Sequence, residues 1–454
     1  MTDLGPDKNL SASVPKKWLI LSHGFNMDGR AASQTITDKI PYLLNAGIEL
    51  SVISAITGIK DHRFSHQQLI AWGPSAFRFD FRHWFANRFG RGLAYKIITP
   101  LVSILLSPLI LIEKLIWGYS SQWSWALPAY LLGLKLIRQG KVNLIYSTGG
   151  AWSAHLAGLW LKKKTGLPWI VEAHDPLVIR ENASDLGLQI PKEPDARKRH
   201  WLEKQICRYA DLVWWFTDGA LEFAKKRNPE LKKGLMIVPG ANPPAVDSVL
   251  ASASHRYTPH LNIAHFGSLA DDRSLTQVLE VLPQFFQEFP QAKEQLTFHI
   301  YGASLDRKSK SWLDQSPYQQ NVVEHGRLEL DPVSGLTGRQ RIAIKMQESD
   351  VLLLLHGNTE WCQEYIPSKL YDYFWISRPI WAITYKNSQL DKLIQERGGY
   401  ISNSEQPNSI YTELTQVWHD WKRRSLRQPE ISPITVEKAC SQIISQIIEL
   451  SICK

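Results

Sequence analysis

The stretch KWLILSHGFNMDGR, residues 17–30, predicts the fold class of this chain. Its first six residues form a short apolar run typical of a buried strand, and the loop that follows contains Gly24, Asn26 and Gly29. A helical pattern then extends to residue 45, and residues 48–56 (IELSVISAI) form a second apolar run. This order predicts a βαβ unit with its loop at the carboxyl end of a strand, where α/β proteins bind ligands.

The same alternation continues along both halves of the chain. Further strands are predicted at residues 142–147, 168–173, 212–216, 261–266, 296–301, 351–355 and 379–383. Between the halves, residues 238–244 (VPGANPP) contain three prolines and a glycine, which disfavour regular structure. Because 454 residues exceed the size of one hydrophobic core, we predict two α/β domains of the doubly wound, Rossmann-like type. The predicted boundaries are 1–240 for the first domain, 241–260 for a linker, 261–425 for the second domain and 426–454 for a C-terminal helix.

Charge and cysteine content limit the possible partners. Lys and Arg number 52 against 43 for Asp and Glu, and this modest excess of +9 fits an acidic membrane surface or polyanionic ligands without singling out nucleic acid. The four cysteines have no zinc-site or redox spacing, which favours reduced thiols in the cytosol. The N-terminus lacks the order of a secretion signal. We therefore expect a cytoplasmic protein with no nucleic-acid partner.

One segment departs from this soluble pattern. Residues 97–112 are sixteen residues without a charge, too short to span a bilayer comfortably and interrupted by Pro100 and Pro108. The residues around them are basic or aromatic, namely Arg78, Arg82, Arg88, Arg91, Lys96, Trp84, Trp117, Trp123 and Trp125. This pattern favours an interfacial membrane segment over residues 97–117. The alternative is a buried helix pair inside the first domain.

The stretch EYIPSKLYD, residues 364–372, places two carboxylates eight positions apart across the start of a predicted helix. Pro367 and Ser368 favour a helix start there, so Glu364 would precede the helix and Asp372 would lie one turn inside it. The helix N-terminus suits a diphosphate, and a carboxylate suits sugar hydroxyls. The alternative interpretation is an ordinary capped surface helix.

The longer stretch EYIPSKLYDYFWISRPIWAI, residues 364–383, resembles the donor-binding region of the retaining glycosyltransferases of family 4, which have the GT-B fold. The likeness implies two Rossmann-like domains that face an interdomain cleft, with a C-terminal helix crossing back to the first domain. It also implies that Glu364 and Asp372 contact the donor sugar and the ribose. Asp372 is aspartate where the family has glutamate. Ile366, Pro367, Ser368 and Lys369 fall within the same match and are implied to bind the donor.

A second match is HFGSLADDRSL, residues 265–275, which is similar to the phosphate-binding loop of the family. Gly267 matches the glycine of that loop. Ser268 stands where an arginine is usual, and Arg273 stands at the lysine position, where its guanidinium could bind phosphate through two hydrogen bonds. The alternative is that Arg273 pairs with Asp271 or Asp272 on a solvated loop.

In the first half, residues 145–176 resemble the family segment in which a strand ends in a polar pair before a proline. His174 and Asp175 occupy that place and could orient the acceptor hydroxyl or receive its proton. The alternative is a histidine hydrogen-bonded to the adjacent loop. The glycine loop of Gly24, Asn26 and Gly29 would allow close approach to donor phosphate or acceptor.

The resemblance implies a retaining hexosyl-type glycosyltransferase that moves a sugar from a nucleotide-sugar donor to a lipid-linked or polysaccharide acceptor. We predict His174, Asp175 and Glu364 as catalytic residues, none of them a nucleophile, with no metal and no cofactor. Cell-surface glycan biosynthesis at the inner face of the plasma membrane, with peripheral membrane association, is the expected setting. The alternatives are a non-catalytic carbohydrate-binding or partner-binding protein and a sugar-nucleotide epimerase.

Overall fold

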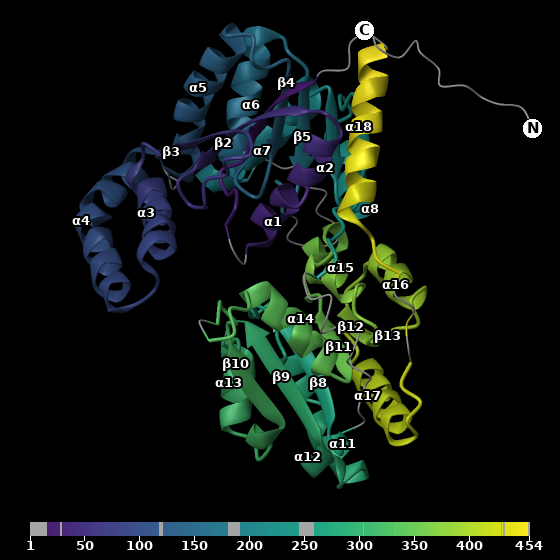
Figure 1. The fold of residues 1–454 in the computed structure, drawn as a ribbon. Helices are drawn as coiled ribbons and strands as arrows, with labels where there is room; N and C mark the ends of the chain where they lie inside the picture. The colour runs from purple at the N-terminus through teal and green to yellow at the C-terminus, as the bar shows by residue number, and fades with distance from the viewer. Residues whose placement is uncertain are drawn as a thin grey trace, which may run out of the picture.

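The computed structural model describes residues 16–27, 30–117, 121–179, 191–244, 258–302, 304–331, 333–427, 429 and 432–452. In this part of the chain, a seven-stranded sheet lies in the first half and a six-stranded sheet in the second (Figure 1). The first sheet has the order β3-β2-β1-β4-β5-β6-β7, and each strand pairs in parallel with its neighbours. Its strands are β1 Lys17–Leu21, β2 Glu49–Ala55, β3 Ser65–Leu69, β4 Leu144–Thr148, β5 Trp169–Ala173, β6 Leu212–Trp215 and β7 Gly234–Met236.

The second sheet is also entirely parallel, with the order β10-β9-β8-β11-β12-β13. Its strands are β8 Leu261–Gly267, β9 Leu296–Gly302, β10 Val322–Gly326, β11 Val351–Leu355, β12 Ile380–Thr384 and β13 Tyr400–Asn403. In both sheets the chain turns back at a switch in strand order, between β1 and β4 and between β8 and β11. The two doubly wound α/β domains predicted from the sequence are therefore confirmed.

Helices cover both sheets. Those of the first half are α1 Ala31–Thr37, α2 Ile40–Asn45, α3 Pro74–Phe89, α4 Leu93–Trp117, η1 Ser121–Trp125, α5 Ala126–Arg138, α6 Trp152–Thr165, α7 Pro194–Tyr209 and α8 Asp218–Arg227. Those of the second half are α10 Thr276–Leu279, α11 Leu282–Glu288, α12 Ala292–Gln295, α13 Arg307–Asp314, η2 Gln319–Asn321, α14 Gly338–Glu348, η3 Glu360–Glu364, α15 Lys369–Tyr373, α16 Ser388–Gln395, α17 Pro407–Lys422 and α18 Val436–Ile452.

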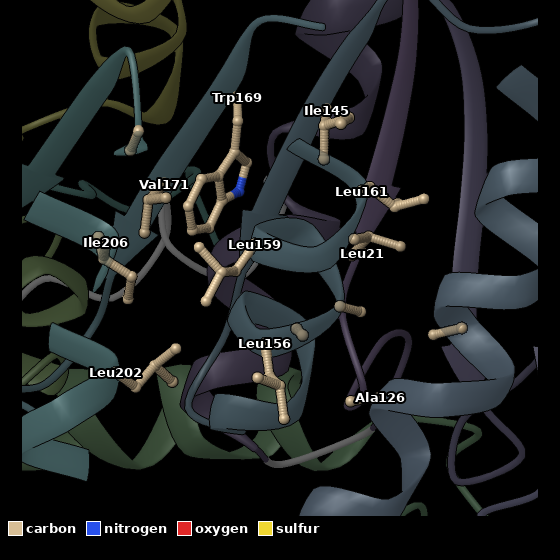
Figure 2. Close-up of a cluster of buried hydrophobic side chains, with 14 of the residues drawn as sticks. Leu21, Ala126, Ile145, Leu156, Leu159, Leu161, Trp169, Val171, Leu202 and Ile206 are labelled. Atoms are coloured by element: carbon tan, nitrogen blue, oxygen red, sulfur yellow. The ribbon is translucent and has the colours of Figure 1, made fainter. Parts of the chain in front are cut away.

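The core of the first domain is built around a buried tryptophan. Trp169 on β5 is fully buried, and its indole N–H donates to the Ser147 hydroxyl at 2.9 Å. Figure 2 shows its ring among aliphatic side chains from β5 and α6, including Leu159 and Val171. Gly158 allows this packing, because a Cβ there would lie 2.5 Å from the indole nitrogen. The close approach fixes α6 against the strands that carry the first-domain site.

The C-terminal helix crosses back to the first domain, as predicted. Figure 1 shows α18 alongside the first sheet rather than the second. Its apolar side, with Ala439, Ile443 and Ile447, is buried in one cluster with Trp18 and Trp214 of the first domain. This burial of apolar surface attaches the end of the chain to its beginning and joins the two domains a second time.

The two domains contact each other through segments that follow the carboxyl ends of strands. Thr217, which comes after β6, donates its hydroxyl to the backbone oxygen of Glu364 at 2.6 Å. Arg339, at the start of α14, lies 3.3 Å from Asp38 of the first domain. The ligand-binding edges of the two parallel sheets therefore face the same boundary, which is the GT-B arrangement that the sequence predicted.

The structure differs from the sequence prediction in its edge strands. The prediction missed β3, β7, β10 and β13, and these are the outermost strands of the two sheets. An edge strand is covered on fewer sides, so a strand such as SHQQL in β3 lacks the apolar run that marks a central strand. The predicted helix at residues 30–45 is two helices, and Pro41 in the first turn of α2 explains the break.

The apolar segment forms one helix in a projecting hairpin. Helix α4 continues for 25 residues through Pro100 and Pro108, and Figure 1 shows it beside α3 at the outside of the first domain. Residues 93–116 are long and apolar enough to cross a membrane, although length and composition alone make this weak support for a span. The most apolar stretch is 11% buried. The alternative of a buried helix pair inside the domain is therefore wrong.

The first testable prediction concerns pH. His155 on α6 is fully buried, and burial together with repulsion from His174 lowers its pKa to about 3. The unfolded chain takes up this proton near pH 6.5, so the contribution to stability is complete above pH 6.5 and is lost as the pH falls below it. Between pH 7.5 and pH 5.5, we expect the free energy of unfolding to fall by roughly 1.4 kcal/mol more in the native protein than in His155→Gln.

Urea denaturation at pH 7.5, 6.5 and 5.5 measures this difference. His62 is exposed, so His62→Gln is the matched control. Its free energy of unfolding should change with pH as that of the native protein does. Identical pH slopes for His155→Gln and the native protein would show that His155 does not carry the effect.

Candidate active site

The second domain places a lysine next to a glycine at the end of its central strand. Gly267 ends β8 with a φ of +119°, and a Cβ at this position would lie 2.7 Å from the Lys369 Nζ. Lys369 comes from the start of α15, which follows the adjacent strand β11. A side chain at Gly267 would therefore displace the amine, and the glycine and lysine predicted to bind the donor are brought together.

The amine of Lys369 is held by a buried histidine. Its Nζ lies 3.1 Å from Nε2 of His265, whose Nδ1 lies 3.1 Å from the Leu353 backbone oxygen. Burial and the nearby Lys369 hold the pKa of His265 well below its usual value. The neutral ring donates through Nδ1 to Leu353 and accepts through Nε2 from the lysine. Sequence reasoning missed His265, although it is the ionisable residue within the buried, mostly apolar strand β8.

Arg273 adds a second cation to this place. Burial, and after it the charge of Arg273, hold the pKa of Lys369 well below its usual value. The Nε of Arg273 is buried without a hydrogen-bond partner among the described residues. Asp271 pairs with Arg307 at 3.1 Å, and no salt bridge joins Arg273 or Lys369 to a carboxylate in the described part of the chain. The arrangement suits a bound anion and disfavours the solvated-loop alternative for Arg273.

The carboxylate of Glu364 lies at the boundary with the first domain. Its side chain is fully buried, and Oε2 lies 4.0 Å from a guanidinium nitrogen of Arg227 on α8. Gly219 permits this close contact, since a Cβ there would lie 2.0 Å from the Gln363 backbone oxygen. The sequence predicted that Glu364 contacts the donor sugar. In the structure it faces a cation of the other domain, because the α8 segment packs directly onto η3, and its contact with the sugar stays a prediction.

The helix that follows Glu364 is shorter than predicted. Helix α15 has five residues and begins after Ser368, whose side chain makes no capping hydrogen bond. Pro367 is buried and Ile366 is partly buried beside the core of the second domain. So short a helix has little dipole of its own, and the role of its N-terminus toward a diphosphate stays a prediction. The cations Arg273 and Lys369 remain as the groups that could hold phosphate.

Asp372 lies inside α15, as predicted, and contacts a bridging arginine. Its Oδ1 is 3.7 Å from Arg339, which also pairs with Asp38 of the first domain at 3.3 Å. The Asp372 side chain is 44% exposed, but the protein around its carboxyl group removes most of the nearby water. This desolvation raises the pKa of Asp372 to about 6, and Arg339 opposes the increase. Ser268 is exposed on the loop after β8. Sequence reasoning missed Arg339, because nothing near residue 339 indicates a contact with Asp38.

The first domain holds a histidine against a buried carboxylate. His174 Nε2 lies 2.9 Å from Glu172 Oε1 and 3.1 Å from the Thr148 hydroxyl, and its ring packs on Phe216 at 4.9 Å. Asp175 is exposed, and its surroundings raise its pKa through desolvation against the effect of His174. His174 thus bonds to side chains of β5 and β4 rather than to the adjacent loop, and these contacts fix the orientation of its ring.

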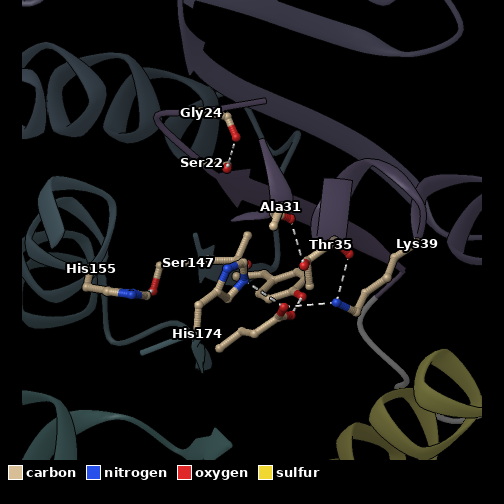
Figure 3. Close-up of polar contacts among 11 residues, drawn as sticks. Ser22, Gly24, Ala31, Thr35, Lys39, Ser147, His155 and His174 are labelled. Carbon is tan, nitrogen blue, oxygen red and sulfur yellow. Dashed lines mark hydrogen bonds and ion pairs between the residues drawn. The ribbon is translucent and has the colours of Figure 1, made fainter. Parts of the chain in front are cut away.

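Glu172 is the centre of a buried charge network. It is fully buried, and Lys39 lies 2.9 Å from its Oε1 while the Tyr146 hydroxyl donates to Oε2. Burial alone would raise its pKa, but Lys39 and then His174 outweigh this and lower the pKa to about 2. Figure 3 shows Lys39 extending from the first helices toward the cluster that contains His174. Sequence reasoning missed Glu172, although a glutamate inside the apolar strand WIVEA is itself a signal.

The predicted glycine loop is tightly held. Gly24 accepts a hydrogen bond from the Ser22 hydroxyl at 3.1 Å, and Asn26 adopts a φ of +52° while its backbone N–H donates to Thr37 at 3.2 Å. Gly29 lies outside the described residues. His23 of the same loop lies 3.1 Å from Asp80, which is fully buried on α3. The loop is therefore anchored at the carboxyl end of β1, two strands from β5, which His174 follows.

Comparisons with known proteins identify the fold. No protein-family model matches the chain, and no curated protein matches it. Among solved structures, a trehalose 6-phosphate synthase from Burkholderia multivorans is similar with a TM-score of 0.60 at 9% identity, over 96% of this chain and 97% of the other. Anabaena HepE, solved with UDP and glucose, has a TM-score of 0.51 at 12% identity, over 96% and 98%. The fold is GT-B.

A third GT-B neighbour is the E. coli protein bound with UDP-2-fluoro glucose, with a TM-score of 0.55 at 10% identity over 96% of this chain and 97% of the other. At identities of 9–12% these likenesses establish the arrangement of the two domains and no residue-level correspondence. The roles of individual side chains must therefore be argued from the contacts described above.

The second testable prediction concerns the Glu172 network. Glu172→Gln leaves Lys39 buried without its counter-charge, and Lys39→Met leaves Glu172 in the same condition. We expect each single variant to lower the free energy of unfolding by about 3–5 kcal/mol. The double variant removes both charges and should regain much of this loss. Urea denaturation at pH 7 measures the three values.

The exposed pair of Lys345 and Glu348, 2.6 Å apart, provides the control. Glu348→Gln should change the free energy of unfolding by less than about 1 kcal/mol. Losses below this limit for both Glu172→Gln and Lys39→Met would mean that the buried pair does not hold the first domain together.

Proposed function

We propose that the protein is a glycosyltransferase that uses a nucleotide-sugar donor. One observation carries the proposal: Lys369 lies beside Gly267 at the carboxyl edge of the second sheet, and it is close enough to Arg273 for the charge of Arg273 to lower its pKa. A diphosphate would supply the opposite charge that these two cations lack within the described residues. The GT-B fold supports the proposal, since neighbours of this fold were solved with UDP or a UDP-sugar.

The proposed chemistry is electrostatic. As the bond between the sugar and the diphosphate breaks, negative charge grows on the leaving phosphate. Arg273 would bind this phosphate through its fork of N–H groups, and Lys369 would be drawn to its charged form by the anion. In this proposal the two cations act without a metal ion or cofactor. The leaving phosphate oxygen helps to accept the proton of the acceptor, the anomeric configuration is retained, and no side chain acts as a nucleophile.

The first domain would receive the acceptor. His174 is held by Glu172 and Thr148, so its ring has a fixed direction at the end of β5, and Asp175 is exposed beside it. We infer that His174 orients the acceptor hydroxyl and that Asp175 contributes a hydrogen bond to it. We further propose a lipid-linked or polysaccharide acceptor and a place at the inner face of the plasma membrane, in cell-surface glycan synthesis. The apolar helix α4 supports peripheral membrane association.

Ser268 and Asp372 depart from the family pattern, and this departure is the basis for the non-catalytic alternative. Lys369 lies close enough to Arg273 for their charges to interact, so a second cation is present although residue 268 is serine. This observation favours a working diphosphate site over a vestigial one. The epimerase alternative has no comparable support.

The third testable prediction concerns donor binding. Arg273→Ala removes one charge-assisted contact with the phosphate, worth about 1.5–3 kcal/mol. We expect its affinity for the preferred nucleoside diphosphate to fall roughly 10- to 150-fold, measured by isothermal titration with UDP, GDP and ADP. Turnover of the corresponding nucleotide sugar should fall with it, while the melting temperature without ligand changes little.

Arg307→Ala is the matched control, because Arg307 is 86% exposed and pairs with Asp271 nearby. It should bind the same nucleotide as tightly as the native protein. If the native protein binds none of the three nucleotides at millimolar concentration, the proposed function fails. Equal affinities for Arg273→Ala and the native protein would remove Arg273 from the site.

A further inference from the structure

The helical hairpin of α3 and α4 carries an exposed apolar surface. Figure 1 shows it projecting from the first domain, away from the body of the sheet. Leu105 and Leu115 are each 76% exposed, and Ile104 is 66% exposed. The other exposed aliphatic side chains of α4 are Leu93, Ile97, Ile98, Leu101, Leu109, Leu111, Ile112 and Ile116. Keeping so much apolar surface in water is unfavourable, at about 25 cal/mol per Å², so an apolar partner is expected to cover it.

The charges of the hairpin indicate which partner this is. Its two acidic residues are buried: Glu113 on α4 accepts from Ser75 on α3, and Asp80 contacts His23 of the loop after β1. The basic side chains are all exposed, namely Arg78, Arg82, Arg88, Arg91, Lys96 and Lys114. An apolar surface bordered by cations alone complements an anionic lipid bilayer, whose interior is apolar and whose headgroups are negative.

A cluster of arginines lies where the hairpin meets both domains. Arg91, in the turn between α3 and α4, pairs with Glu329 of the second domain at 3.1 Å. Arg30 follows the glycine loop of the first domain, and burial and then the charges of Arg327 and Arg91 lower its pKa. No described carboxylate forms a salt bridge with Arg30. The cluster therefore connects the apolar hairpin with the boundary between the two sheets.

We propose that the acceptor is a phosphate-bearing lipid, whose hydrocarbon chains lie against α4 and whose phosphate is bound by Arg30 and Arg91. This inference rests on the proposed function, and it names the class of acceptor. Guanidinium groups bind phosphate through paired N–H donors, and several in one place select a dianion over a singly charged headgroup. The lipid phosphate would then lie beside the glycine loop, so that the hydroxyl to be glycosylated reaches the interdomain boundary.

Vesicle flotation at 0.1 M salt tests the proposal. The full chain is mixed with vesicles of phosphatidylcholine alone, with 20 mol% phosphatidylserine, or with 20 mol% phosphatidic acid, whose terminal phosphomonoester is the probe. We expect binding to increase in that order, with phosphatidic acid at least about fivefold above phosphatidylserine. Soluble glycerol 3-phosphate at 1 mM should not displace the protein, because it lacks the chains that α4 covers.

Three variants separate the parts of the site. Leu105→Glu should abolish binding to all vesicles, because it places a charge in the apolar surface. Arg30→Gln should bring phosphatidic acid binding down to the phosphatidylserine level, and Arg63→Gln, an exposed arginine paired with Asp61, should behave as the native protein. Circular dichroism and melting temperature show whether each variant folds. Failure of the native protein to bind any vesicle, or equal binding to the two acidic vesicles, would overturn the proposal.

Nucleotide titration keeps this test distinct from that of the proposed function. Arg30→Gln and Leu105→Glu should bind nucleoside diphosphate as tightly as the native protein, because neither residue belongs to the Arg273 and Lys369 site. Equal binding of the native protein to the two acidic vesicles, with intact nucleotide binding, refutes the lipid inference alone. Absence of nucleotide binding in the native protein refutes the proposed function, and the vesicle result then has to be explained by other means.

Discussion

The second domain keeps the basic side chains of Arg273 and Lys369 close enough for the charge of Arg273 to oppose that of Lys369 and lower its pKa. Neighbouring residues hold the Lys369 amine in this position. Gly267 provides the space for the Lys369 amine, and His265 accepts its hydrogen bond while remaining neutral. Such a site is prepared for an anion before the anion arrives, so binding costs little rearrangement. The proposed binding of a nucleotide-sugar donor follows from this anion site.

The boundary between the domains places that anion site opposite the first sheet. Thr217 bonds to the backbone of Glu364, Arg339 connects Asp38 with Asp372, and α18 crosses from the second domain to the first. These contacts are polar or limited in area except for the helix, which buries an apolar face. Contacts of this kind between domains permit relative motion. The buried position of Glu364 against Arg227 belongs to this arrangement, and it would change if the domains separated.

The sequence predicted more of the fold than of the site. Central strands such as β1, β5 and β11 were predicted because they are buried on both faces and therefore read as apolar runs. The edge strands were missed because less of their surface is buried. In the site, Gly267, Arg273 and Lys369 were predicted from local matches and are brought together. Glu172, Lys39, His265 and Arg339 were missed, since each acquires its role from a partner that is distant in the sequence.

By itself, the sequence determined the two doubly wound domains, the C-terminal helix and the positions of the polar loops, because periodicity and chain breaks are local properties. Tertiary structure alone decided which of these loops face each other and which charges have partners. Glu364 and Arg273 illustrate the difference. Both carry a charge after a strand, but packing of α8 gives the glutamate a cation, whereas folding places the arginine near a second basic side chain, that of Lys369. Charge balance depends on distances across the folded chain, and sequence spacing does not contain those distances.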